Sequence, residues 1–149
     1  MIFRSWEFRD LLNITQMEAE CFTNERWTYE MFSSAFEQEG FFGVICEDFD
    51  ALGEKTGIAY GCVQCVAEQS DLLILAVLPE YRRNGIGETL LKRLLSGAKR
   101  RGAEKMFLEV RQSNLSAQSL YVRQGFEQVA MRKKYYPDGE NALVMVKQL

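Results

Sequence analysis

The chain has 149 residues, of which 47% are hydrophobic and 26% charged, and its formal net charge is −3. This length and composition are typical of one globular domain with a sizeable core. The mildly acidic balance argues against direct nucleic-acid binding, because nucleic-acid binders are usually basic. The longest apolar run is far below the roughly 18 residues that span a bilayer. We therefore expect a single cytoplasmic domain over residues 1–149 that does not contact a membrane.

The sequence contains no histidine, which removes the commonest general base and the commonest metal ligand. Acid–base chemistry would then depend on Glu, Asp, Tyr, Lys or Cys. Cys62 and Cys65 form a C-x-x-C pattern in a segment with strand character, where residues three apart face opposite sides. No second pair completes a metal site. We expect reduced cysteines that pack in the core, and no bound metal.

The N-terminal part predicts a strand, two helices and two further strands. Asp10 and Thr28 each precede a helical segment and are candidate N-caps. The strands are expected at 2–8, 41–47 and 58–68, with an exposed hairpin tip over 48–57, and the helices at 11–21 and 28–38. The expected core residues of the first helix are Leu11, Leu12, Ile14, Met17 and Phe22.

Residues 72–78 form a short apolar run closed by Pro79, which is typical of a strand buried on both faces. Apolar side chains then recur at helical spacing from Ile86 to Ala98. A further strand over 105–111 completes a β-α-β unit with two parallel strands. The remaining elements are a helix over 115–124 with Asn114 as its cap, and strands over 126–135 and 142–147 joined by the turn at 137–139.

The segment between the apolar strand and the long helix carries two arginines and two glycines. Glycines let a backbone approach a ligand closely, and a helix start offers free N–H groups and the positive end of the helix dipole. Together these features suit an anion such as phosphate. A plain turn with solvated arginines is the alternative. A dinucleotide-binding turn does not fit, because Leu90 stands where its third small residue belongs.

This segment, Arg82-Arg83-Asn84-Gly85-Ile86-Gly87, resembles the [QR]-x-x-G-x-[GA] signature of the GNAT superfamily of N-acetyltransferases. The element order β-α-α-β-β-β-α-β-α-β-β is also similar to that of the GNAT fold. The resemblance implies an α/β fold with a mixed, mostly antiparallel sheet of about seven strands, about four helices and one central β-α-β unit. It implies acetyl-coenzyme A as cosubstrate, with cofactor contacts from Leu75, Ala76, Val77, Arg82, Arg83, Asn84, Gly85, Ile86, Gly87 and Asn114.

Two residues are candidates for proton transfer. A carboxylate such as Glu109, within an apolar strand, is costly unless it has partners or stays protonated, and burial would suit it to act as a base. A solvated Glu109, or one paired with Arg111, is the alternative. Tyr121 lies in a helical segment, where a core position is the alternative to a catalytic one.

The stretch from Leu108 to Phe126 is similar to the bacterial ribosomal-protein-alanine N-acetyltransferases, the RimI family. The resemblance implies that Glu109 accepts a proton from the incoming amine through water and that Tyr121 donates one to the coenzyme A sulfur. The chain departs from the family at Arg26-Trp27-Thr28, where Pro-Trp-Ser is frequent. It departs again at Arg123, where a smaller polar residue contacts the cofactor.

The expected function is therefore acetyl transfer to the α-amino group of a protein N-terminus, with the N-terminal alanine of a small-subunit ribosomal protein as the acceptor. Trp27, Tyr135 and Tyr136 are the expected acceptor-binding residues, although each could instead be a packing aromatic. An enzyme acting on a small amine or a lysine side chain is one alternative. A non-catalytic coenzyme A-binding module is another.

Overall fold

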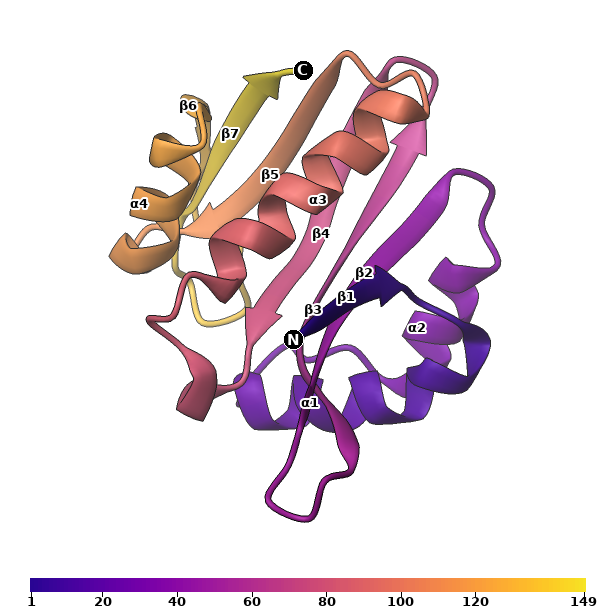
Figure 1. The fold of residues 1–149 in the computed structure, drawn as a ribbon. Coiled ribbons are helices and arrows are strands. Elements are labelled where there is room, and N and C mark those ends of the chain that lie inside the picture. Colours follow the sequence, from indigo (N-terminus) through magenta and orange to yellow (C-terminus); the bar gives the residue numbers. More distant parts are fainter.

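A computed structural model describes all residues, 1–149. One seven-stranded sheet, in the order β1-β2-β3-β4-β5-β7-β6, forms the centre of the molecule. Helices α3 and α4 cover one face, and α1 and α2 cover the other (Figure 1). The strands are β1 (Ile2–Ser5), β2 (Phe41–Phe49), β3 (Lys55–Val66), β4 (Gln69–Val77), β5 (Lys105–Arg111), β6 (Glu127–Arg132) and β7 (Ala142–Gln148). The helices are α1 (Leu11–Cys21), α2 (Tyr29–Phe36), α3 (Ile86–Arg100) and α4 (Leu115–Arg123).

The strand pairing confirms the expected fold class. Only β4 and β5 pair in parallel, on either side of the α3 crossover, and every other neighbouring pair is antiparallel. The apolar side of α3 packs on the larger core, whereas α1 and α2 enclose a smaller core on the opposite face. Cys62 packs in the smaller core and Cys65 in the larger one, as residues three apart on a strand should.

The structure corrects the predictions for the first strand and for the cap of the first helix. The first strand ends at Ser5, and a 3-10 turn follows at Phe8–Asp10. Asp10 does not cap α1, because its carboxylate accepts hydrogen bonds from Arg4 at 2.7 and 2.8 Å and from the amide of Glu7 at 2.7 Å.

Two residues expected in the core of the first helix lie at the surface. The exposed fractions of Leu12 and Phe22 are 62% and 37%. Glu18 takes the inward position instead and is 2% exposed. Helical periodicity identified the correct face of α1 but not which polar side chain would be buried with it.

Strand β4 contributes buried side chains to both cores, as expected for residues 72–78, except that Leu73 is 37% exposed. A register shift lies where Val63 pairs with Leu72 and Cys62 pairs with Ile74, so that Leu73 is an extra residue on β4. This β-bulge breaks the alternation of side chains. Leu72 consequently packs in the larger core and Ile74 in the smaller one, on opposite faces.

Two caps are confirmed and one boundary is shorter than expected. The Thr28 hydroxyl accepts a hydrogen bond from the Met31 amide at 3.2 Å, and Asn114 Oδ1 accepts one from the Ala117 amide at 3.1 Å. Strand β6 ends at Arg132, so the residues that follow form a loop before β7. No helix has the length and apolar character that crossing a membrane would require.

Candidate active site

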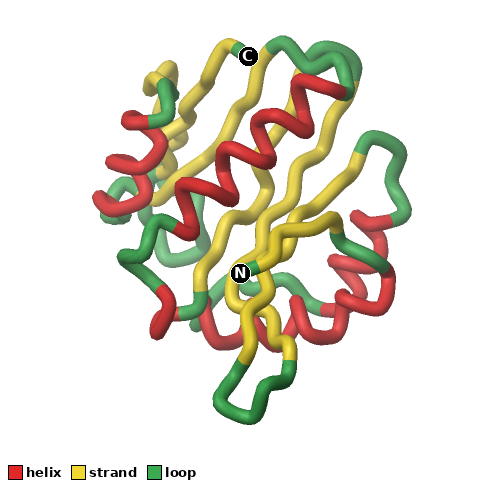
Figure 2. Tube along the Cα trace, in the orientation of Figure 1, coloured by secondary structure: helices red, strands yellow, loops and turns green.

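The two parallel strands separate toward their carboxyl ends. They pair only where Gln69–Asp71 face Lys105–Phe107. Beyond these three pairs the strands diverge, and the divergence is visible as an opening V in the ribbon (Figure 1) and in the backbone trace (Figure 2). The bulge at Leu73 coincides with this divergence. The sheet is therefore open in its middle, next to the start of α3.

The loop before α3 exposes a run of backbone donors. The N–H groups of residues 83–88 donate to no acceptor within the chain, and the helical ladder begins with Thr89 N to Gly85 O at 3.1 Å. Arg83 and Gly85 both have positive φ, at 67° and 76°. Alternating left-handed residues turn successive N–H groups toward one concavity, which suits an anion.

Two side chains of this loop bind the loop itself. Arg82 Nε donates to the carbonyl of Val77 at 2.9 Å, and Asn84 Nδ2 donates to the carbonyl of Tyr81 at 3.2 Å. These bonds fold the loop back onto the end of β4 and fix the direction of its N–H groups. Arg83 is exposed and contacts no acceptor of the chain. Arg82 is therefore bound within the chain, whereas the guanidinium of Arg83 is free to bind a ligand.

Gly87 has no packing reason to be glycine. Its φ is not positive, and a Cβ built there would lie 3.7 Å from both Leu120 and Val77, an ordinary contact distance. The fold would thus accept a small side chain at this position. Close approach of a ligand to the free N–H groups explains the glycine better than the chain's own packing does, so the loop fits a pyrophosphate.

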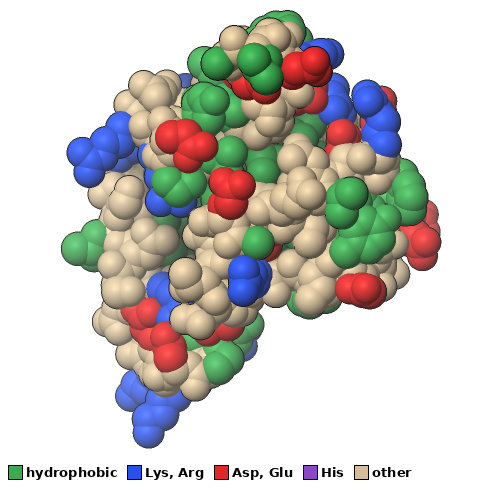
Figure 3. Space-filling model, turned by 90° about the horizontal axis from the view of Figure 1, so that it is seen from below, with side chains coloured by type: hydrophobic (Ala, Val, Ile, Leu, Met, Phe, Trp, Pro, Cys, Tyr) green, Lys and Arg blue, Asp and Glu red, His purple; other side chains and the backbone are tan.

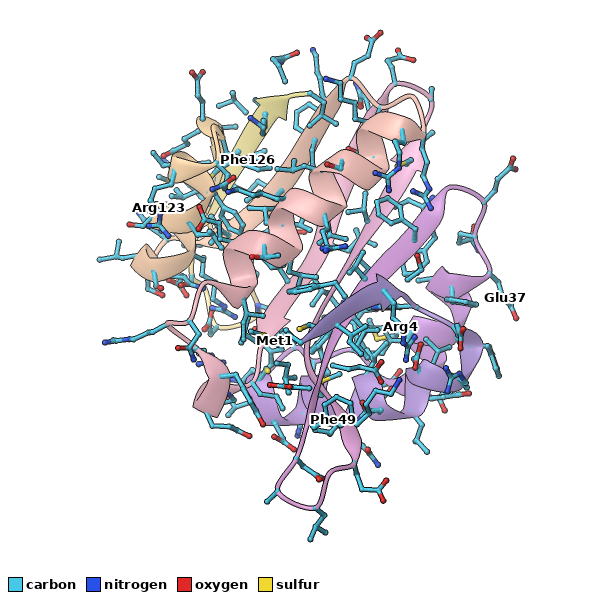
Figure 4. The ribbon with its side chains drawn as sticks, in the orientation of Figure 1. Met1, Arg4, Glu37, Phe49, Arg123 and Phe126 are labelled. Atoms are coloured by element: carbon cyan, nitrogen blue, oxygen red, sulfur yellow. The ribbon has the colours of Figure 1, made fainter.

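Tyr121 on α4 lies beside this opening, on the face covered by α3. Its ring is buried against Phe126 at a centroid distance of 5.8 Å, and no group of the chain hydrogen-bonds its hydroxyl. Burial, assisted by the nearby Tyr136, raises the pKa of Tyr121 to about 12. The phenol therefore keeps its proton throughout the neutral range. Arg123, on the same helix, is exposed (Figure 4).

Glu109 lies on the other face of β5, and of the alternatives left open for it the solvated one holds. Its side chain is 34% exposed and forms an ion pair with Arg132 at 2.9 Å. The Tyr135 hydroxyl donates to its other oxygen at 3.2 Å. The alternative partner considered for it, Arg111, binds other carboxylates. Two partners thus hold Glu109 in place while leaving it open to solvent.

A groove of about 610 Å³ lies over Glu109 on this face. It brings together all three aromatic residues expected to bind the acceptor, since Trp27, Tyr135 and Tyr136 line it. Its other lining residues are Gln69, Asp71, Leu72, Leu73, Phe107, Leu108, Glu109, Arg132 and Val144. Burial, with a smaller contribution from Glu109, raises the pKa of Asp71.

Arg111 joins the two loops at the mouth of this groove. Its guanidinium binds Asp138 at 2.8 Å and Glu140 at 2.7 Å, both in the β6–β7 loop, and also Glu25 in the α1–α2 loop. The same guanidinium lies 4.0 Å above the ring of Tyr136. One side chain of β5 therefore fixes both loops relative to the sheet.

Tyr136 lies close to both candidates for proton transfer. Its pKa is raised by burial first and by Glu109 second, and it in turn raises the pKa of Tyr121. Glu109 and Tyr121 point to opposite sides of the sheet, but both lie near the same half-buried phenol. The opening between β4 and β5 is where these two sides meet.

Glu18 holds the loop that carries Trp27, one of the residues that line the groove. It accepts a hydrogen bond from the amide of Trp27 at 2.9 Å and another from the hydroxyl of Tyr60. Burial raises the pKa of Glu18. This carboxylate ties the α1–α2 loop to the middle of β3, so Trp27 is held over the groove by its backbone as well as by its ring.

We expect Glu18→Gln to change the pH dependence of stability. A carboxyl whose folded pKa is raised gives stability that is present below its ordinary pKa and lost as pH rises through the raised one. The free energy of unfolding of the wild type, relative to Glu18→Gln, should therefore fall as the pH rises above about 4.5, the ordinary pKa of a glutamate carboxyl. Urea unfolding at several pH values measures it. Glu18→Ala, which leaves two donors without an acceptor, should be about 3 kcal/mol less stable than Glu18→Gln at every pH. A difference between wild type and Glu18→Gln that does not change with pH would contradict the prediction.

Sequence reasoning missed several residues of the groove. Asp71 directly precedes the apolar run, and its position in a strand was the one available signal. Arg132 gave no local signal, since its pairing with Glu109 joins residues far apart in the sequence. The same holds for Glu25, which reaches Arg111 from a loop 86 residues earlier.

Comparisons with known proteins agree with this geometry. The Acetyltransferase (GNAT) family matches residues 8–126. A ribosomal protein bS18-alanine N-acetyltransferase of Salmonella typhimurium is 33% identical over 127 residues, which cover 80% of this chain and 86% of that protein. The Escherichia coli K12 protein of the same name is 40% identical over 90 residues, which cover 58% of this chain and 61% of that protein.

The solved structures agree as well. The crystal structure of the ribosomal-protein-S18-alanine N-acetyltransferase from Escherichia coli superposes with a TM-score of 0.85 at 30% identity, over 99% of this chain and 92% of that one. A NatC complex bound to Gag peptide and CoA shares the fold, with a TM-score of 0.85 at 18% identity, over 99% of this chain and 98% of that one. The chain therefore belongs to the GNAT family of acetyltransferases, within the group of ribosomal-protein-alanine N-acetyltransferases (RimI) that its sequence resembles.

Proposed function

We propose that this protein transfers the acetyl group of acetyl-coenzyme A to the α-amino group of a protein N-terminus, and that the acceptor is the N-terminal alanine of a small-subunit ribosomal protein. The observation that carries the proposal is the open sheet between β4 and β5, with anion donors on one face and an acceptor groove on the other. The relatives named for this activity support the same assignment.

The free N–H groups of residues 83–88 would bind the pyrophosphate, with Arg83 adding charge from outside. Leu75, Ala76 and Val77 at the end of β4, and the side chain of Asn114 at the start of α4, complete the proposed cofactor contacts. Acetyl-coenzyme A supplies an acetyl group activated as a thioester.

The two proton transfers are assigned to residues on opposite faces of the sheet. Glu109 would take a proton from the incoming ammonium through water, because only a neutral amine has the lone pair that attacks. Tyr121 would give its proton to the departing sulfur, and its raised pKa keeps that proton available at neutral pH. The ring of Tyr136, held under the guanidinium of Arg111, lies near both groups.

An extended N-terminus would lie in the groove with its amine toward Glu109. Asp71 has no salt-bridge partner in the chain, so the groove has an unneutralised carboxylate near its floor. Such a groove favours a basic residue after the acceptor amine. Trp27 and Tyr135 offer flat apolar surfaces to the peptide, and Tyr135 is 48% exposed.

An acceptor screen tests this function. Peptides with the N-terminal sequences of ribosomal proteins, peptides with an internal lysine and a blocked N-terminus, and free polyamines are compared by kcat/KM. The expected result is fastest acetylation of a peptide that begins with alanine and carries basic residues next. Faster acetylation of polyamines or of internal lysine would reassign the acceptor, and no turnover with any amine would favour a non-catalytic coenzyme A-binding module.

The acceptor residues should show their role in KM. Tyr135→Ala is expected to raise KM for the peptide about tenfold while barely changing KM for acetyl-coenzyme A, because contacts shared by ground and transition states appear in KM. Asp71→Asn should lower the preference for arginine over glutamine at the second peptide position, and added salt should do the same. Steady-state kinetics on matched peptides decides both. Glu54→Gln, on the distant β2–β3 tip, is the matched charge control.

A further inference from the structure

A second groove lies on the other flank of α3, between that helix and the edge strand β1. Its volume is about 570 Å³, and it lies on the face of the sheet that α3 covers, opposite the groove over Glu109. Met1 and Arg4, labelled in Figure 4, mark the position of β1. The lining residues are Phe3, Arg4, Ser5, Phe42, Val44, Thr89, Lys92, Arg93, Ser96, Arg100 and Arg101.

The groove is cationic although the chain is acidic. Five of its lining residues are basic and none is acidic, whereas the formal net charge of the whole chain is −3. Seen from below, the molecule instead shows acidic and basic side chains interspersed (Figure 3). Arg4 is neutralised by Asp10 and Glu47. The charges of Arg93, Arg100 and Arg101 have no carboxylate partner.

Two of these arginines are held in place by aromatic rings. The guanidinium of Arg93 lies 4.9 Å from the centroid of Phe3, and that of Arg101 lies 3.9 Å from the centroid of Phe42. Cation–π contacts of this kind order the side chain without consuming its hydrogen-bond donors. Arg101 donates one hydrogen bond, from Nη1 to the carbonyl of Gly97 at 3.0 Å. The remaining donors are free to bind an anion in the groove.

The strand beside the groove has an open backbone edge. Trp6 N donates to Gly43 O at 2.9 Å, and hydrogen-bonded pairs alternate along an antiparallel ladder, so Arg4 and Ile2 also face β2. Phe3 and Ser5 therefore direct their backbone groups outward. The outward carbonyl of Ser5 accepts from Arg4 at 3.1 Å. Both groups of Phe3 and the N–H of Ser5 stay free to pair with an added strand.

We propose that this surface binds an extended acidic segment of a partner protein, which adds to β1 as an antiparallel or parallel strand and places its carboxylates under α3. Alternate residues of an added strand face the same side and are about 6.8 Å apart. Arg93 and Arg100 are about 10.5 Å apart along the helix. An acidic residue at every second position therefore presents two or three carboxylates to these guanidinium groups, while main-chain hydrogen bonds supply the affinity.

The observations favour a peptide over a nucleic acid. The rings of Phe3 and Phe42 are covered by guanidinium groups, so they offer no platform on which a base could stack. The free donors and acceptor of the β1 edge match a peptide backbone, which a nucleic acid lacks. The acidic balance of the chain also opposes a long polyanion.

The test uses a fluorescein-labelled ten-residue peptide in which glutamate alternates with valine and threonine. Fluorescence anisotropy with the full chain should show saturable binding that weakens with salt. Arg100→Glu, at an exposed position, should weaken binding about tenfold, since it replaces a charge-assisted contact by repulsion. Arg100→Lys should keep most of the affinity. Acetyl transfer by both variants should stay unchanged, because Arg100 is remote from the active site.

A second probe separates strand addition from charge alone. The same peptide carrying N-methyl groups at alternate residues keeps every carboxylate but cannot complete the ladder, so it should bind at least about tenfold more weakly. Equal binding of the methylated peptide would overturn strand addition. Tighter binding of a single-stranded oligonucleotide of equal charge, or concentration-dependent self-association through this edge that excludes the peptide, would overturn the proposed partner.

Discussion

Gly87→Asp should abolish acetyl-coenzyme A binding while the protein stays folded. A Cβ at this position meets only ordinary contacts at 3.7 Å, and an aspartate in the first turn of a helix is favourable to the helix itself. The new carboxylate would, however, lie among the free N–H groups of residues 83–88 and repel a pyrophosphate. Like charges in contact cost several kcal/mol, so the affinity should fall by about 100-fold or more. Calorimetric titration with acetyl-coenzyme A measures the loss.

Two controls make the result specific. Thr89→Asp adds the same charge to the same turn of α3 at an exposed position outside the free N–H run, so it should bind acetyl-coenzyme A nearly normally. Gly87→Ala should give an intermediate loss from bulk alone. Thermal unfolding of Gly87→Asp within a few degrees of wild type shows that the fold survives. Unchanged affinity in this variant would remove the loop from the cofactor site.

Tyr121→Phe and Glu109→Gln should each slow acetyl transfer by about 10²–10³-fold, with different pH profiles. Tyr121 carries its proton well beyond the neutral range because its pKa is about 12, so its loss should slow turnover equally from pH 6 to 9. The effect of Glu109→Gln should be largest at low pH, where most of the acceptor amine is protonated and needs a base. Single-turnover kinetics with a saturating peptide isolates the chemical step.

Neither substitution should harm the fold. No group of the chain hydrogen-bonds the Tyr121 hydroxyl, so removing it strands no partner. The amide oxygen that Glu109→Gln introduces could still accept a hydrogen bond from Tyr135. Tyr29→Phe in α2 and Glu127→Gln in β6 are the matched controls, both outside the groove. Near-normal turnover of both active-site variants under these conditions would refute the assignment of the two roles. A loss confined to one of them would refute the role of the other alone.

Local sequence determined much of this protein. The periodicity of α3, the caps at Thr28 and Asn114 and the turn glycines each depend on neighbouring residues, and the element order follows from them. The Arg82–Gly87 segment predicted a loop with free backbone donors for the same reason, since its geometry is built from consecutive residues. The alternation of a strand likewise predicts Cys62 and Cys65 on opposite faces of the sheet, which is where they lie.

Tertiary structure alone decided the groove over Glu109. The ion pair of Glu109 with Arg132 and the convergence of Glu25 and Glu140 on Arg111 join segments far apart in the sequence, and no local pattern encodes them. The burial of Glu18 follows from the donors that Trp27 and Tyr60 bring to it, because a carboxylate can enter a core only where its oxygens are bonded. The opening between β4 and β5 also depends on contacts between strands. The extra residue Leu73, which coincides with the opening, can be recognised only from the pairing of β4 with β3.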